Sequence, residues 1–269
     1  MQDNYVHGYE HAAASRLEVQ ARTLDQLLHR DNVFIGETLL EVGCGTGSQT
    51  LRLARNRPDL RITAIDRSEA SIAIARKRCS HCPNVRFIVA DLFDMPVGER
   101  SFDNALVCFL LEHIASPPVA LKELLRLLRP GAVVSVIEGD HGSVLMHPDS
   151  AAARAAIACQ VQLQAATGGN ANIGRTLYPL LKEAGLNDVE VEPCPIYVDG
   201  QNTLLSQGFT LGTFTAMIEG IKDRSLEHGL IDETAFDEGI AALKRTANSD
   251  GVFCYTFFRA LARVGPAIN

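Results

Sequence analysis

The chain has 269 residues, of which 46% are hydrophobic and 21% charged, so it can bury a sizeable core. Its net charge of −7 argues against a basic nucleic-acid-binding surface. No stretch approaches the roughly 18 apolar residues of a membrane span, and residues 1–16 lack the apolar segment of a secretory signal. We therefore expect a globular cytoplasmic protein with neither nucleic acid nor membrane as partner, and a homo-oligomer stays open.

Strands and helices alternate along the first half of the chain. We expect a helix over residues 10–28, whose leucines recur on one face, and then an apolar strand at Thr38–Val42 that ends in a glycine-rich turn. Further strands are predicted at residues 62–65, 85–89, 104–109 and 132–137. A helix with Ser116 as N-cap and Pro117 at its first position precedes the last of these strands. This alternation predicts a parallel sheet with helices on both faces.

The regular alternation stops after residue 137. An alanine-rich helix is expected after Pro148, a helix at residues 176–184, a strand at 188–192 and a final aromatic-rich strand at 253–261. Between the last two strands, residues 196–248 contain at least two helical segments. We interpret this stretch as a helical cap inserted before the last strand.

The glycine-rich turn is the most informative motif, because glycines there allow positive φ and close approach of a ligand. It contains Gly43, Gly45 and Gly47, and the helix behind it offers free N–H groups. Asp66 ends the second strand, where a carboxylate can accept hydrogen bonds from a ribose diol. Asp91 follows the third strand, where it could accept from an adenine amino group.

Together these motifs, over residues 39–137, resemble the class I S-adenosylmethionine (SAM)-dependent methyltransferases, in the small-molecule branch that includes quinone C-methyltransferases. The resemblance implies an α/β fold: a Rossmann-like, seven-stranded, mostly parallel sheet with helices on both faces and the last strand antiparallel. It implies SAM as cofactor, with Glu41 and the three glycines of the turn on the methionine part, Asp66 on the ribose and Asp91 on the adenine. The assigned cofactor residues are Glu41, Gly43, Cys44, Gly45, Gly47, Asp66, Arg67, Asp91, Leu92 and Phe109.

We divide the chain accordingly. Residues 1–36 form an N-terminal helical segment over the cofactor pocket, residues 37–195 and 249–265 form the SAM-binding domain, and residues 196–248 form the cap. The expected function is methyl transfer to a small-molecule acceptor. The acceptor atom stays open among carbon, oxygen and nitrogen, because methyl transfer depends largely on positioning.

The catalytic half of the site is expected just after the fifth predicted strand. Glu138, Asp140 and His141 fall within four residues there, in a loop that should face the transferred methyl. His141 is the candidate proton acceptor, since the unperturbed pKa of histidine lies near neutral pH. The alternative is that Asp140 and His141 only brace the loop. In either case, the acceptor is expected between the segment 138–141 and the cap.

Three residues are assigned to the acceptor. Tyr9 lies in the N-terminal segment, which folds over the pocket in related proteins. Arg175 could pair with an acidic group of the acceptor or brace its own loop. Tyr197 is expected, with Phe209, Phe214 and Met217, on the inner face of the cap, where ordinary core packing is the alternative.

Other kinds of site are disfavoured. A C-x-x-C at Cys79 and Cys82 is interpreted as a helix end, and the seven cysteines as reduced thiols. His147 could form a metal site together with Glu138 or Asp140. Nothing else in the residue spacing supports such a site, so no metal is predicted.

Two alternative functions stay open. An NAD-binding oxidoreductase would need the fingerprint G-x-G-x-x-G, and position 48 is Ser48 rather than glycine. Glu41 is also poorly placed for a site that cradles a pyrophosphate. The second alternative is a binding module that holds SAM without catalysis.

Overall fold

The computed structural model describes residues 23–24, 33–95 and 97–266. Tyr9 and nearly all of the helix predicted at residues 10–28 lie outside this part. The chain divides into two compact units, which we describe separately. The sheet unit comprises His29–Glu138, Ile173–Glu192 and Phe258–Asn269, and the helical unit comprises Met1–Leu28, Gly139–Asn172 and Pro193–Phe257.

Seven strands form one sheet in the order β3-β2-β1-β4-β5-β7-β6. They are β1 (Thr38–Val42), β2 (Arg61–Asp66), β3 (Val85–Val89), β4 (Phe102–Cys108), β5 (Leu128–His147), β6 (Asn187–Asp199) and β7 (Val252–Arg263). The first five pair in parallel. Strand β7 runs antiparallel to β5: Gly131 N–H donates to the Val264 carbonyl, and Val264 N–H to the Ala132 carbonyl. The predicted mostly parallel Rossmann-like sheet is confirmed.

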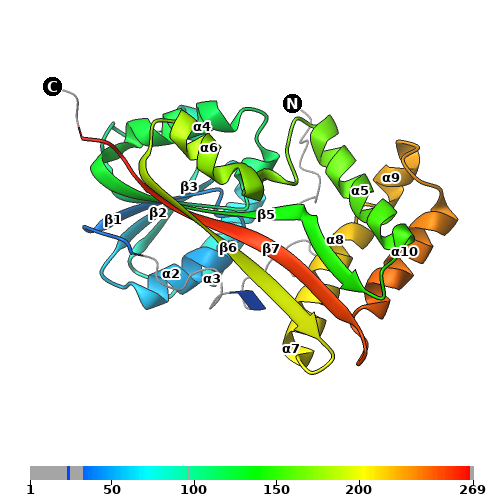
Figure 1. The fold of residues 1–269 in the computed structure, drawn as a ribbon. Coiled ribbons are helices and arrows are strands. Elements are labelled where there is room, and N and C mark those ends of the chain that lie inside the picture. The colour runs from blue at the N-terminus through cyan, green and yellow to red at the C-terminus, as the bar shows by residue number, and fades with distance from the viewer. Residues whose placement is uncertain (1–22, 25–32, 96, 267–269) are drawn as a thin grey trace. The chain divides into compact units, whose positions relative to one another are not determined.

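Helices cover both faces of the sheet within the sheet unit. Helices α2 (Ser48–Asn56) and α3 (Glu69–Arg78) lie on one face, and α4 (Pro117–Leu127) and α6 (Leu177–Glu183) on the other (Figure 1). The Ser68 hydroxyl accepts from Ser71 N–H and caps α3. Ser116 is the N-cap residue of α4, as predicted, although its side chain makes no capping hydrogen bond. Short helices η1 (Leu92–Asp94), η2 (Leu111–His113) and η3 (Ile173–Thr176) complete this unit.

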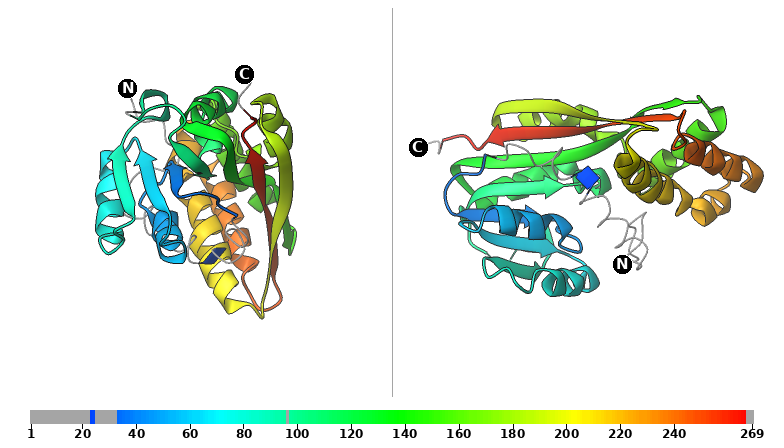
Figure 2. Two further views of the ribbon diagram at one scale, coloured as in Figure 1. Left: turned by 90° about the vertical axis from the view of Figure 1, so that its left-hand side faces the viewer. Right: turned by 90° about the horizontal axis from the view of Figure 1, so that it is seen from below.

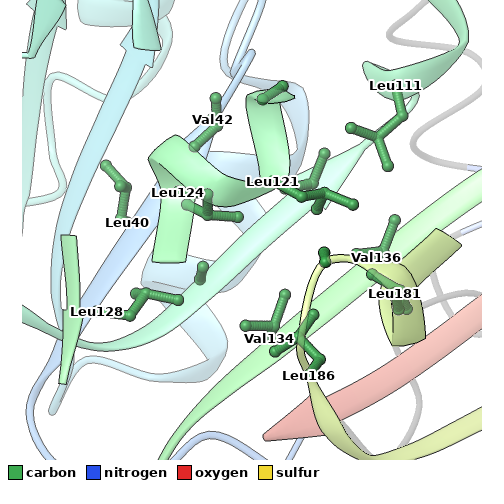
Figure 3. Packing of buried hydrophobic residues seen from close by; sticks show 14 of the residues in the cluster. Leu40, Val42, Leu111, Leu121, Leu124, Leu128, Val134, Val136, Leu181 and Leu186 are labelled. Carbon is green, nitrogen blue, oxygen red and sulfur yellow. The ribbon is translucent and has the colours of Figure 1, made fainter. Parts of the chain in front are cut away.

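The core of the sheet unit lies between the strands and the α4–α6 face. Leucines at the predicted helical spacing on α4, Leu121 and Leu124, pack toward Val134 and Val136 of β5 and Leu181 of α6 (Figure 3). All five side chains are buried. This packing holds the parallel strands in register and so fixes where their carboxyl ends lie.

Two strands are longer than predicted. Strand β5 was expected at residues 132–137 and runs from Leu128 to His147, and β6 was expected at 188–192 and runs from Asn187 to Asp199. The loop predicted after residue 137 is therefore wrong, because Asp140 and His141 lie within β5. The glycines and polar residues of this segment resemble a turn locally. Pairing with distant strands outweighs that local preference.

The helical unit contains α5 (Ala151–Ala166), α7 (Thr203–Leu205), the π-helix η4 (Ser206–Thr215), α8 (Ala216–Glu219), α9 (Lys222–Glu227) and α10 (Glu233–Arg245). Helices α5 and α10 pack along each other (Figure 2). Gly239 permits this close approach, since a Cβ there would stand 2.8 Å from the Ala156 Cβ. The unit is larger than the cap predicted at 196–248 because α5 belongs to it. No helix in the described ranges is long and apolar enough to cross a membrane.

A polar cluster at the amino end of β1 and β4 ties these two strands together. Asp103 accepts hydrogen bonds from the backbone N–H groups of Glu37 and Thr38, at 3.0 and 3.1 Å, and from the Thr38 hydroxyl at 2.8 Å. Arg129 pairs with its other oxygen. Burial alone would raise the pKa of Asp103, but the Arg129 guanidinium and these donors outweigh it and lower the pKa to about 2.

We expect Asp103→Asn to destabilise the fold at neutral pH. One pKa unit is worth about 1.4 kcal/mol, so the loss of unfolding free energy at pH 7 should be about 2 kcal/mol. Because the folded pKa is depressed, this stabilisation is present above about pH 4 and is lost as the pH falls through about 2. Denaturant unfolding at several pH values would measure it. Glu183→Gln, an exposed charge removal on α6, is the control; equal losses in both variants would contradict the assignment.

Candidate functional site

The glycine-rich turn joins β1 to α2 and takes the conformation that the sequence predicted. Gly43, Gly45 and Gly47 have φ of +73°, +52° and +76°. Gly43 N–H donates to the Ile65 carbonyl at 2.9 Å, and a Cβ at Gly47 would stand 2.9 Å from the Ala75 Cβ. At Gly45, in contrast, no atom of the described residues beyond its chain neighbours lies within 4 Å of where a Cβ would be. The turn is thus tied to β2 and α3 on one side and open beside Gly45.

Arg78 braces this turn from α3. Its Nη1 donates to the Thr46 carbonyl at 2.7 Å and to the Thr46 hydroxyl at 2.8 Å. Sequence reasoning missed this contact, because no local spacing relates position 78 to position 46. Helix α3 ends at the C-x-x-C, with Cys79 as the C-cap residue, and burial raises the pKa of Cys79 to about 12. Cys79 and Cys82 are both free.

Asp66 lies at the carboxyl end of β2, as predicted, and faces the turn. Its Oδ2 accepts from Gly45 N–H at 2.8 Å, and its Oδ1 accepts from Ser68 N–H at 2.9 Å. A carboxylate has about four lone-pair positions, so each oxygen keeps capacity for a further donor. The carboxylate is held at the open side of the turn and can accept from hydroxyl groups of a ligand.

Glu41 lies within β1 and is buried. Burial raises its pKa to about 7, and the negative charge of Asp66 contributes to this rise. Within the described ranges its Oε2 has no hydrogen-bond partner. A buried carboxyl oxygen without a partner is unfavourable, and a cationic group beside it would remove that penalty.

The other predicted cofactor residues also belong to the sheet unit. Asp91 is exposed and caps η1, with its Oδ1 accepting from Phe93 N–H at 3.0 Å, and Leu92 beside it is buried. Arg67 is exposed. Phe109 follows β4 with φ of +55°, and its N–H donates to the Ile137 carbonyl at 2.9 Å. These residues and Cys44, which is buried in the turn, follow the carboxyl ends of β1, β2, β3 and β4, where ligands bind in sheets of this kind.

Glu138 has a structural task within the sheet unit. Its Oε1 accepts from the N–H groups of Leu110 and Leu111, at 3.0 and 2.7 Å, and so fixes the segment after β4. Burial, together with the nearby charge of Glu112, raises the pKa of Glu138 well above its ordinary value. Because its Oε1 already accepts from two backbone N–H groups, Glu138 is less suited than His141 to take a proton from an acceptor.

Asp140 and His141 lie on the part of β5 that belongs to the helical unit. Asp140 Oδ1 accepts from Gly142 N–H at 3.0 Å. His141 is buried, its backbone N–H donates to the Ala171 carbonyl at 3.1 Å, and its ring Nδ1 lies 3.1 Å from the Tyr255 hydroxyl. Sequence reasoning missed Tyr255. The signal available was the alternation of aromatic residues on the last strand, which places Tyr255 on one face.

The residues assigned to the acceptor are found in different environments. Arg175 is exposed on η3 of the sheet unit. Phe209, Phe214 and Met217 are buried in the helical unit, but Tyr197 is 60% exposed on β6. Tyr197 therefore lies on strand β6 and not on a cap helix, and its assignment to the acceptor stays a prediction. In the described part of the chain no group of three or more His, Cys, Asp or Glu could hold a metal ion.

Comparison with known proteins supports one family. Residues 40–136 match a family model described as a methyltransferase domain. A 2-phytyl-1,4-naphtoquinone methyltransferase of Thermosynechococcus vestitus is 33% identical over 39% of this chain and 48% of its own. A demethylmenaquinone methyltransferase of Clavibacter sepedonicus is 34% identical over 38% of this chain and 41% of its own. O-methyltransferase cnsE of Penicillium expansum is 36% identical over 39% of this chain and 40% of its own. The chain therefore spans less than half the length of these relatives.

Solved structures share the fold over most of the chain. The [4+2]-cyclase SpnF has a TM-score of 0.58 and 22% identity, covering 92% of this chain and 82% of its own. A phosphoethanolamine N-methyltransferase 2 of Haemonchus contortus in complex with SAM has a TM-score of 0.55 and 18% identity, covering 92% of this chain and 52% of its own. At these identities the likeness establishes the fold.

Proposed function

We propose that this chain, whose residues 40–136 match a methyltransferase domain, is a class I SAM-dependent methyltransferase that transfers a methyl group from SAM to a small-molecule acceptor. The observation that carries the proposal is the turn at Gly45. It is open on one side, and a carboxylate, Asp66, is held against its backbone N–H. The NAD-binding alternative is disfavoured, because α2 begins at Ser48, where a dinucleotide fingerprint requires glycine.

The side chains present suit SAM. When bound, SAM supplies a methyl group on a positively charged sulfur that is transferred by direct displacement. Glu41 offers a buried carboxyl oxygen, without a partner in the described ranges, to a cationic group. Asp66 keeps acceptor capacity for ribose hydroxyls, and exposed Asp91 for an amino group. The three carboxyl groups therefore match the cationic part, the ribose and the adenine of SAM.

For the acceptor we propose His141 as the group that takes a proton. The buried ring is held by Tyr255, whereas Glu138 and Asp140 already accept backbone N–H groups. An acceptor atom that loses a proton during methylation needs such a base, and histidine suits neutral pH. Arg175 stays a candidate partner for an acidic group of the acceptor.

Ligand-dependent thermal unfolding tests the cofactor. A ligand present at 100 times its Kd stabilises the native state by about 2.7 kcal/mol, so SAM and its demethylated product S-adenosylhomocysteine (SAH) should raise Tm by several degrees. NAD should leave Tm unchanged. Stabilisation by NAD and not by SAH would replace the proposal with the oxidoreductase alternative.

Methyl transfer needs a separate measurement, since one protein of this fold is described as a [4+2]-cyclase. Radiolabelled SAM and a panel of acceptors would be used. Naphthoquinones come first in that panel, because two of the relatives are named for methylating such rings. SAM binding without transfer to any acceptor would favour the non-catalytic module.

A further inference from the structure

A hydrogen-bonded pair of polar side chains lies inside the helical unit. The Tyr255 hydroxyl and the His141 Nδ1 are 3.1 Å apart, with the two residues 2% and 5% exposed. Aromatic rings surround them. The ring of Phe214 lies 5.8 Å from that of His141, and the rings of Phe209 and Phe257 lie 5.8 and 4.8 Å from that of Tyr255. In such apolar surroundings a hydrogen bond between two side chains has a strong influence on which protons they carry.

Gly139 gives independent evidence that the sequence accommodates the Tyr255 hydroxyl in this position. A Cβ on Gly139 would stand 2.3 Å from the Tyr255 Oη and 3.7 Å from a ring carbon of Phe257. The residue is not in the left-handed region that favours glycine, so its backbone conformation does not explain it. The absence of a side chain at position 139 leaves the room that the tyrosine hydroxyl occupies next to His141.

We propose that Tyr255 is a positioning residue for His141: its hydroxyl oxygen accepts from Nδ1–H and leaves Nε2 as the nitrogen that takes the acceptor's proton. The inference rests on the proposed role of His141 in methyl transfer. When SAM is bound, the acceptor atom would supply the electron pair of the new bond to the methyl carbon, and the pair of the broken carbon–sulfur bond would remain on the sulfur of SAH. The acceptor's proton would end on Nε2, and the pair of its former bond to hydrogen would stay with the acceptor.

The chemistry of imidazole supports a hydrogen bond in which Nδ1–H donates to the Tyr255 oxygen. A neutral imidazole has one N–H donor and one acceptor nitrogen, but both nitrogens are donors once it is protonated. A buried Nδ1–H in aromatic surroundings needs an acceptor, and the Tyr255 oxygen is placed to be one. The His141 backbone is fixed as well, through its N–H to the Ala171 carbonyl. The hydrogen bond at Nδ1 can therefore persist when Nε2 gains a proton.

The tautomer of His141 can be measured directly. Long-range ¹H–¹⁵N NMR on the ¹⁵N-histidine-labelled protein distinguishes the two ring nitrogens, and His141→Asn identifies the signal among the eight histidines. We expect neutral His141 to carry its proton on Nδ1. In Tyr255→Phe, which keeps the ring, and in Gly139→Ala, which displaces the hydroxyl, the population should move toward Nε2–H. Tyr178→Phe, which changes an exposed tyrosine on α6, should leave the signal unchanged.

Two results would overturn the inference. One is an Nε2–H tautomer in the wild-type protein, a measurement that requires no variant to fold. The other is an unchanged His141 signal in a folded Tyr255→Phe protein. Once an acceptor is found, Tyr255→Phe should lower kcat by about 10-fold and leave KM and SAH affinity within two-fold, whereas a purely structural tyrosine would lower Tm alone. Failure of the proposed function would be seen in a different measurement, because the wild-type protein would then not bind SAH.

Discussion

Gly45→Val should abolish SAH binding while the protein still folds. Position 45 combines a φ of +52° with space that no described residue fills where a Cβ would stand. A valine there should cost about 1–2 kcal/mol of unfolding free energy, because L-residues are strained in this region. Its two methyl groups would also occupy the space beside the Asp66 carboxylate. We expect SAH affinity to fall more than about 100-fold, equivalent to about 2.7 kcal/mol.

The matched control is Gly229→Val. Gly229 has a φ of +63° and, among the described residues, nothing within 4 Å of a Cβ built there, but it lies in the helical unit. Both variants should lose similar unfolding free energy, measured by denaturant titration, and only Gly45→Val should lose SAH binding in calorimetry. Wild-type affinity in a folded Gly45→Val protein would show that the cofactor does not bind at this turn.

The cofactor half of the site could be predicted because its signals are local. The apolar run of β1 ends directly in glycines, and positive φ at Gly43, Gly45 and Gly47 follows from the need for a tight turn before α2. Asp66 could be placed because the carboxyl ends of neighbouring parallel strands meet at one edge of a sheet. Each inference needed only the period of a strand and the residue that follows it.

The end of β5 could not be predicted in this way. Gly139, Gly142 and the polar residues between them are typical of a loop, yet the strand continues to His147. What keeps it extended is contact with β7, where Thr256 N–H donates to the Ser143 hydroxyl at 2.8 Å, across 113 residues of sequence. The Tyr255–His141 contact spans 114 residues. No spacing rule connects such positions, so the partner of the proposed base emerged only from the fold.

The position of His141 changes what its side chain is expected to do. In a loop, its ring could turn between solvent and neighbouring backbone groups, and bracing would be a sufficient role. Within β5 the ring is buried, and both its backbone N–H and its Nδ1 are engaged. A strand holds a side chain more precisely than a loop does, which favours a base that must meet an acceptor in one orientation.

His141→Ala should therefore lower kcat by about 10²-fold or more, with SAH affinity nearly unchanged. The loss reflects removal of the group that takes the acceptor's proton. Steady-state kinetics with any acceptor found in the screen would measure kcat, and calorimetry would measure SAH affinity. His147→Ala, which removes an exposed histidine at the end of the same strand, should keep wild-type kcat.

A second substitution separates proton transfer from packing. His141→Asn keeps a polar group facing the Tyr255 hydroxyl but has no basic nitrogen, so under the base assignment it should be as slow as His141→Ala. Recovery of kcat in His141→Asn would assign the effect to packing around Tyr255. A kcat within a few-fold of wild type in a folded His141→Ala protein would contradict the base assignment altogether and leave catalysis to the positioning of the acceptor. The proposal that SAM binds at Gly45 would survive either result, because it depends on different residues of the sheet unit.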